Sequence, residues 1–100
     1  MSVIKGEAPK TISTELPFTG FAEKFTIKVV YNNITGKQYR ELVEEGKTVA
    51  ELVFAVVSNW DAGYPLSIDG ITDFEDERPG ICDGLLQGYW RARRVDLEKN

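Results

Sequence analysis

The densest group of chemically capable side chains is an acidic run in the second half of the chain. Six carboxylates stand between positions 69 and 83, with a single arginine among them: Asp69, Asp73, Glu75, Asp76, Glu77 and Asp83. Such a run could bind a divalent cation or supply a general acid and a general base. A calcium loop of the EF-hand type places its ligands at alternating positions around a glycine and ends in a glutamate, and that spacing is absent. We therefore expect a solvated acidic face, which the positive end of a helix dipole would favour.

Nucleophilic chemistry has one candidate, Cys82, which is the single cysteine of the sequence. The 100 residues include no histidine, so the usual base for a cysteine nucleophile and the usual nitrogen ligand of a metal are both missing. Ser58 and Ser67 lack the glycine-flanked turn of serine hydrolases, and no glycine-rich phosphate loop occurs. We expect Cys82 to be a small buried apolar residue, and we expect a protein without catalytic, cofactor-binding or metal-binding residues.

A basic segment with an aromatic residue, Trp90-Arg91-Ala92-Arg93-Arg94, follows the acidic run. Three interpretations are open: cations that complement the negative end of a helix dipole, a docking stripe for an acidic protein partner, or a nucleic-acid contact. The whole chain has 12 Lys and Arg against 16 Asp and Glu, a net charge of −4. Nucleic-acid binders usually carry the opposite balance, so the helix-end interpretation is favoured and we expect no nucleic-acid partner.

The composition is that of one soluble domain. One hundred residues can bury a modest core, and 42% apolar with 28% charged residues is typical of a globular protein. A single cysteine excludes an internal disulfide. No apolar run approaches the roughly 20 residues of a membrane span, and the N-terminal residues lack the apolar stretch of a secretory signal. We therefore expect a cytoplasmic protein that does not bind membranes.

The elements that must position these groups begin with strands. Residues 1–17 contain two prolines and few apolar residues, so we expect a flexible arm, or an edge strand over Thr11–Leu16. Residues 21–31 alternate with period two, which predicts a strand with one solvated face. The side chains predicted to point inward are Phe21, Phe25, Ile27, Val29 and Tyr31, and those predicted to point outward are Lys24, Thr26 and Lys28.

Two helices are predicted after this strand. Thr35–Gln38 and Thr48–Glu51 are capping boxes, in which a threonine accepts from the backbone three residues later while the glutamine or glutamate reaches back. The first helix has Tyr39, Leu42 and Val43 on one face and ends at Gly46 in a left-handed conformation. The apolar spacing of the second helix continues from Val49 to Trp60.

Two more helices complete the predicted fold. Ser67 caps a helix with Ile68, Ile71 and Phe74 inward, and Pro79 suits the first turn of a last helix in which Ile81, Leu85 and Tyr89 repeat. Gly84 and Gly88 share one face of that helix, where we expect close packing against another helix. The fold class is therefore α+β: a small antiparallel β element near the N-terminus, then three to four short helices packed as one layer. Residues 18–100 form its single globular domain.

Several weak motifs stand in a familiar order over residues 21–100. They are the helical stretch that ends in Trp60-Asp61, the turn Gly63–Ser67, the step Arg78-Pro79-Gly80 and the sequence Tyr39–Leu42 after the strand. This order is similar to that of the tail assembly chaperones of long-tailed, siphovirus-type bacteriophages and prophages. Asn59 departs from the glycine that usually precedes the tryptophan in that family.

The resemblance implies a function without catalysis. Such a chaperone binds the tape-measure protein, keeps it soluble while tail tube subunits polymerise around it, and leaves before the virion matures. The alternative is a structural tail, tail-terminator or neck protein that stays in the virion. The candidate partner-binding residues are large apolar side chains left over once the core is filled, together with the basic segment: Phe54, Trp60, Tyr64, Leu86, Trp90, Arg91, Arg93 and Arg94. For each of the apolar candidates, burial statistics favour the alternative of a place in the core. A homo-oligomer is open.

The last residues, Glu98-Lys99-Asn100, raise a coding-level hypothesis. The resemblance implies that a ribosomal frameshift can produce a longer form, whose extra domain recruits tail tube protein. Lys-Asn can be encoded by AAA-AAC, and a preceding GAA or GAG places an A-rich slippery run at this point. The alternative is a plain solvated C-terminus, and the codons of the gene distinguish the two.

Overall fold

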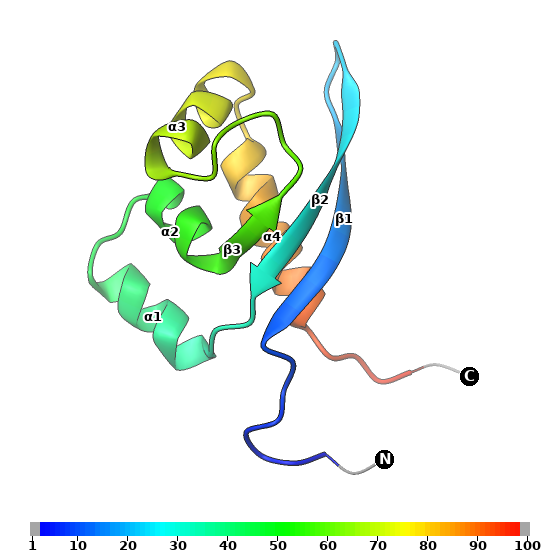
Figure 1. Ribbon diagram of the computed structural model, residues 1–100, viewed down its shortest axis with the longest axis vertical. Helices are drawn as coiled ribbons and strands as arrows, with labels where there is room; N and C mark the ends of the chain where they lie inside the picture. Colours follow the sequence, from blue (N-terminus) through cyan, green and yellow to red (C-terminus); the bar gives the residue numbers. More distant parts are fainter. Residues whose placement is uncertain (1–2, 99–100) are drawn as a thin grey trace.

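Strands and helices follow one another in an α+β order along residues 3–98, the part of the chain that the computed structural model describes (Figure 1). This order confirms the predicted fold class. The frameshift hypothesis concerns Lys99 and Asn100, which lie outside the described residues. The elements are β1 (Thr11–Thr19), β2 (Lys24–Asn32), α1 (Gly36–Glu44), α2 (Val49–Val56), β3 (Val57–Trp60), α3 (Ile68–Glu77) and α4 (Ile81–Arg93).

The three strands form one antiparallel sheet in the order β1-β2-β3. β1 pairs with β2 along its whole length, from Thr11 opposite Asn32 to Thr19 opposite Lys24. β1 is therefore an edge strand. It runs through Pro17 to Thr19, so the predicted boundary between the arm (residues 1–17) and the domain (residues 18–100) falls inside this strand. A proline is tolerated there because an edge strand has backbone groups that no neighbouring strand requires.

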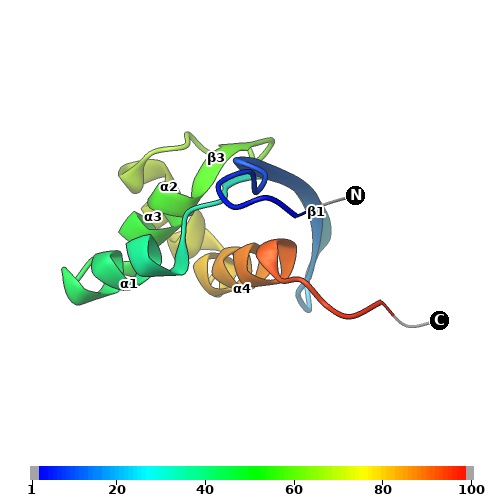
Figure 2. The same ribbon diagram turned by 90° about the horizontal axis from the view of Figure 1, so that it is seen from below.

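One face of the sheet is buried and the other is solvated. Ile27, Val29 and Tyr31 of β2 are buried, while Lys24, Thr26 and Lys28 are exposed, as the alternation predicts. The prediction for Phe21 is wrong: β2 begins only at Lys24, so Phe21 lies in the turn of the hairpin and is fully exposed. α2 and α4 pack against the buried face, and Figure 2 shows α4 beneath the strands.

The second helix is shorter than the apolar spacing predicts. α2 ends at Val56, Val57 has extended backbone with φ −98° and ψ 122°, and β3 then pairs with β2 on the side away from β1. Trp60 therefore ends a strand rather than a helix. A run of apolar and β-branched residues suits both structures, and the free edge of β2 decides between them.

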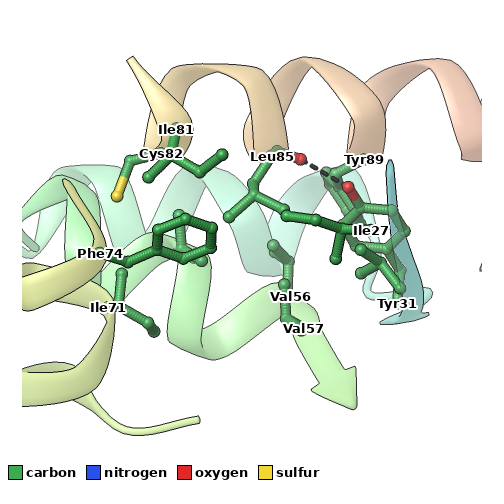
Figure 3. Packing of buried hydrophobic residues seen from close by; sticks show 12 residues of the cluster. Ile27, Tyr31, Val56, Val57, Ile71, Phe74, Ile81, Cys82, Leu85 and Tyr89 are labelled. Atoms are coloured by element: carbon green, nitrogen blue, oxygen red, sulfur yellow. Dashed lines mark hydrogen bonds between the residues drawn. The ribbon is translucent and has the colours of Figure 1, made fainter. Parts of the chain in front are cut away.

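The core connects the sheet to α2, α3 and α4 (Figure 3). Tyr31 donates a hydrogen bond from its buried hydroxyl to the Leu85 carbonyl oxygen at 2.7 Å, and its ring lies 5.6 Å from that of Tyr89. Burial raises the pKa of Tyr31, so this hydroxyl stays a donor. The buried core residues are Ile27, Val29, Tyr31, Val53, Val56, Val57, Ile71, Phe74, Ile81, Cys82, Leu85 and Tyr89.

The glycines of α4 allow a strand, rather than a helix, to approach. A Cβ added to Gly84 would lie 2.5 Å from the Phe18 ring, and one added to Gly88 would lie 2.7 Å from a methyl group of Leu16. Both contacts come from β1, which corrects the expected helix–helix packing. The expected place of Pro79 is also wrong, because α4 begins at Ile81 and its N-cap is Gly80.

The first and third helices are less buried than predicted. α1 has the predicted capping box, and Gly46 after it has φ +76°, but none of its residues is buried. Val43 is 52% exposed. In α3, Ile71 and Phe74 face the core, whereas Ile68 is exposed because it lies at the first position of the helix. α1 accordingly stands at one side of the domain (Figure 1).

Candidate partner-binding surface

The acidic run lies on α3, the turn after it and the start of α4. Asp69, Asp73, Asp76 and Asp83 are exposed. Within residues 3–98, no three carboxylate or cysteine side chains are placed to hold a metal ion. Glu75 differs from the others because its carboxylate accepts hydrogen bonds from the backbone N–H groups of Gly80 at 2.8 Å and Cys82 at 2.9 Å. It therefore caps the N-terminus of α4, where Gly80 has no side chain to do so.

We expect Glu75→Gln to lower the free energy of unfolding by about 1 kcal/mol near neutral pH, the usual value of a helix cap. Burial raises the pKa of Glu75, but hydrogen bonds from the backbone of Cys82 and Gly80 outweigh it and hold the pKa below its ordinary value. A carboxylate of this kind stabilises the fold above its unfolded-state pKa, and the contribution is lost as pH falls through the folded-state pKa. Urea unfolding at several pH values should show the difference between variant and parent shrink in acid. A constant difference would contradict the cap.

Cys82 is buried at the start of α4, as expected for a small apolar residue. Burial, with the nearby Glu75 carboxylate as a second cause, raises the pKa of the thiol to about 12. The nucleophilic thiolate is therefore almost absent at neutral pH.

We expect the Cys82 thiol of the folded protein to react with a thiol reagent at least about 100-fold more slowly than in denaturant. The folded protein shields the sulfur from the reagent, and the raised pKa leaves almost none of the reactive thiolate. The measurement is the rate of labelling by an aromatic disulfide, with and without urea. Equal rates in the two conditions would show that this end of α4 opens readily.

Trp60 and Tyr64, two of the candidate binding residues, form contacts inside the protein. The Trp60 indole donates to the Tyr64 carbonyl oxygen at 3.0 Å and meets the Phe74 ring edge to face at 5.6 Å. Tyr64 stacks on Phe74 with the centroids 4.3 Å apart. Both side chains therefore hold the loop between β3 and α3 against α3.

Arg78 is not among the predicted binding residues, although it makes several contacts. Its guanidinium bonds Glu23 at 2.7 Å, donates to the Tyr64 hydroxyl and lies 5.9 Å from the centroid of the Phe25 ring. It thereby connects the β1–β2 hairpin to the end of α3. Only its position before Pro79 indicates that its backbone is extended, and nothing local predicts its partners, which lie far away in the sequence.

Trp90 belongs to a second aromatic group, in which α1 meets the end of α4. It is 42% exposed, and its ring meets that of Tyr39 at 4.8 Å in an edge-on arrangement. Arg93 lies over the rings of Tyr89 and Trp90, 5.7 Å from each centroid, and donates to the Asn33 side chain at 3.1 Å. Cations in the last turn also complement the helix dipole, as expected from the sequence.

The remaining candidates surround this group or lie apart from it. Leu86 is half-buried one helical turn before Trp90, whereas Arg91 and Arg94 are exposed, with Arg94 paired to Asp96 at 3.2 Å. Phe54 is 46% exposed on α2. Tyr39, Leu42 and Val43 are not among the predicted binding residues, although their helical spacing indicates an apolar side on a short helix. We call Tyr39, Leu42, Val43, Leu86 and Trp90 the α1–α4 face.

Comparison of the chain with models of protein families, with curated proteins and with solved structures gives no match. Within residues 3–98, no helix is long and apolar enough to cross a membrane. What the fold and the site define is a small α+β domain with an acidic end at α3 and an aromatic, basic end where α1 and α4 meet.

Proposed function

We propose that the protein is a tail assembly chaperone of a long-tailed bacteriophage or prophage, which binds the tape-measure protein and keeps it soluble during tail tube assembly. The observation that supports this proposal is the α1–α4 face. α1 has an apolar side without one buried residue, and Trp90 beside it is 42% exposed. Exposed apolar groups gathered in one place are typical of interaction sites.

The chemistry of the proposed partner suits such a face. A tape-measure protein is a long helical chain, and its apolar helix faces are uncovered until the tube encloses it. A small domain can cover such a face by binding a helix against its own apolar surface. The net charge of −4 helps the resulting complex to stay in solution. The protein would then act in the cytoplasm of the bacterial host, and a frameshifted longer form would bring the tail tube protein to the complex.

The test is co-expression with a tape-measure fragment that is insoluble by itself. We expect the fragment to move from the pellet to the supernatant and to co-purify with this protein. If the fragment stays in the pellet at every expression ratio while the protein is folded, the proposal is wrong. Mass spectrometry of purified virions separates the alternative, because a structural tail or neck protein would be present in the particle and a chaperone would be absent.

A further inference from the structure

The apolar side of α1 is only partly covered by the rest of the protein. Tyr39, Leu42 and Val43 lie on one side of this helix, and only Tyr39 reaches the aromatic rings of α4. Val43, one turn further, is 52% exposed. From the contact between Tyr39 and Trp90 the two helices diverge (Figures 1 and 2). The α1–α4 face therefore offers apolar side chains from two helices to a third element.

Two arginines without carboxylate partners stand beside this face. Among residues 3–98, Arg94 pairs with Asp96, but no ion pair involves Arg40 or Arg93. Arg91 lies on the other side of α4, where it lines a hollow with Leu16 and Phe18 of β1. Glu41 and Glu44 lie on α1, and the helical spacing puts them on the side away from Tyr39 and Val43. Most carboxylates of the acidic run lie on α3, at the opposite end of the domain from α1 (Figure 1). Asp83 is the exception, because it lies on α4 about one helical turn before Leu86.

We infer that the α1–α4 face binds an amphipathic helix whose apolar stripe is flanked by acidic residues. This inference rests on the proposed function and names the surface and the kind of helix that the chaperone recognises. The apolar stripe covers Val43, Leu86 and Trp90, and the flanking carboxylates meet the guanidinium groups of Arg40 on α1 and Arg93 on α4. Arginine suits this role because its planar fork can form paired hydrogen bonds with a carboxylate.

Two synthetic helical peptides test whether the face prefers a helix with acidic flanks. Each has about 20 residues, which is long enough for a continuous apolar stripe. Both carry the same leucine stripe, one with glutamate flanks and one with lysine flanks. We expect isothermal titration to give an affinity about tenfold higher for the glutamate peptide, with the difference falling as salt is added. Amide NMR shifts should change in α1 and over residues 86–93 of α4, and not in α3. Equal affinities, or shifts centred on α3, would overturn the inference.

A matched pair of variants tests the surface. Val43 and Val49 are 52% and 51% exposed, but Val49 begins α2 and lies beside Glu75 and Asp76 of α3. We expect Val43→Asp to weaken binding of the glutamate peptide by about tenfold, since a carboxylate then enters the apolar contact. Val49→Asp should leave the affinity within about twofold, because it lies outside the contact. Equal effects of the two variants would overturn the inference.

The tape-measure fragment separates this inference from the proposed function. If Val43→Asp and Trp90→Ala solubilise the fragment as well as the parent does, the inference is wrong while the proposed function stands. If the glutamate peptide binds as expected and the fragment stays insoluble, the proposed function fails and the inference stands. A second copy of this chain is the other partner that the α1–α4 face could bind. A dimer of the parent in sedimentation velocity that Val43→Asp dissociates would overturn the inference in favour of self-association.

Discussion

Replacing Gly70 with alanine is expected to destabilise the protein by at least about 3 kcal/mol, at the upper end of what overpacking costs. Gly70 is buried in the first turn of α3, and a Cβ there would lie 2.0 Å from the carbonyl oxygen of Pro65. That oxygen belongs to the backbone of a loop, which the hydrogen bond between Trp60 and Tyr64 holds in place. The clash therefore has to be relieved by moving the loop or the helix. A fall of roughly 12 °C or more in the melting temperature should follow.

Gly63→Ala is the matched control for this prediction. Gly63 lies in the same loop, is exposed, and no atom lies within 4 Å of a Cβ added there. We expect its melting temperature to stay within about 3 °C of the parent, the range of a surface substitution. If Gly70→Ala melted like Gly63→Ala, the loop would yield easily, and the conclusion that the Trp60–Tyr64 hydrogen bond holds it in place would be wrong.

Trp60→Ala is expected to lower the free energy of unfolding by about 3–5 kcal/mol, the range for deleting a large aromatic side chain from a packed site. The variant loses the edge-on contact with Phe74 and leaves the Tyr64 carbonyl oxygen without its indole donor. An acceptor that is left unpaired adds to the cost of the lost contact. Urea unfolding followed by circular dichroism measures the difference.

Trp90→Ala is the same truncation at the other tryptophan. Its ring is 42% exposed, so we expect a loss of about 1 kcal/mol, typical of a point mutation, together with weaker binding of the glutamate peptide. The two tryptophans would then divide their roles, with Trp60 supporting the fold and Trp90 supporting the interaction. A larger loss of stability from Trp90→Ala than from Trp60→Ala would contradict this division.

Features that depend on neighbouring residues were predictable from the sequence. Thr35, Thr48 and Ser67 each accept a hydrogen bond from the backbone three residues later, so the starts of α1, α2 and α3 are determined within four residues. Gly46 has the predicted left-handed conformation because the end of α1 requires it. The alternation of β2 identified its buried face. These interactions form between groups a few residues apart, and a short stretch of sequence therefore contains all the partners.

Features that depend on distant partners were decided by the tertiary structure. The end of α2 and the start of β3 follow from the free edge of β2, and Gly84 and Gly88 face β1 rather than a helix. Of the candidate site, the sequence alone determined that Trp90 and its arginines share one helix end. Only the tertiary structure decided that Trp60 packs against Phe74 and that Tyr39 joins Trp90 at the surface. The physical reason is that burial and pairing depend on which side chains meet across the core, and local spacing does not specify them.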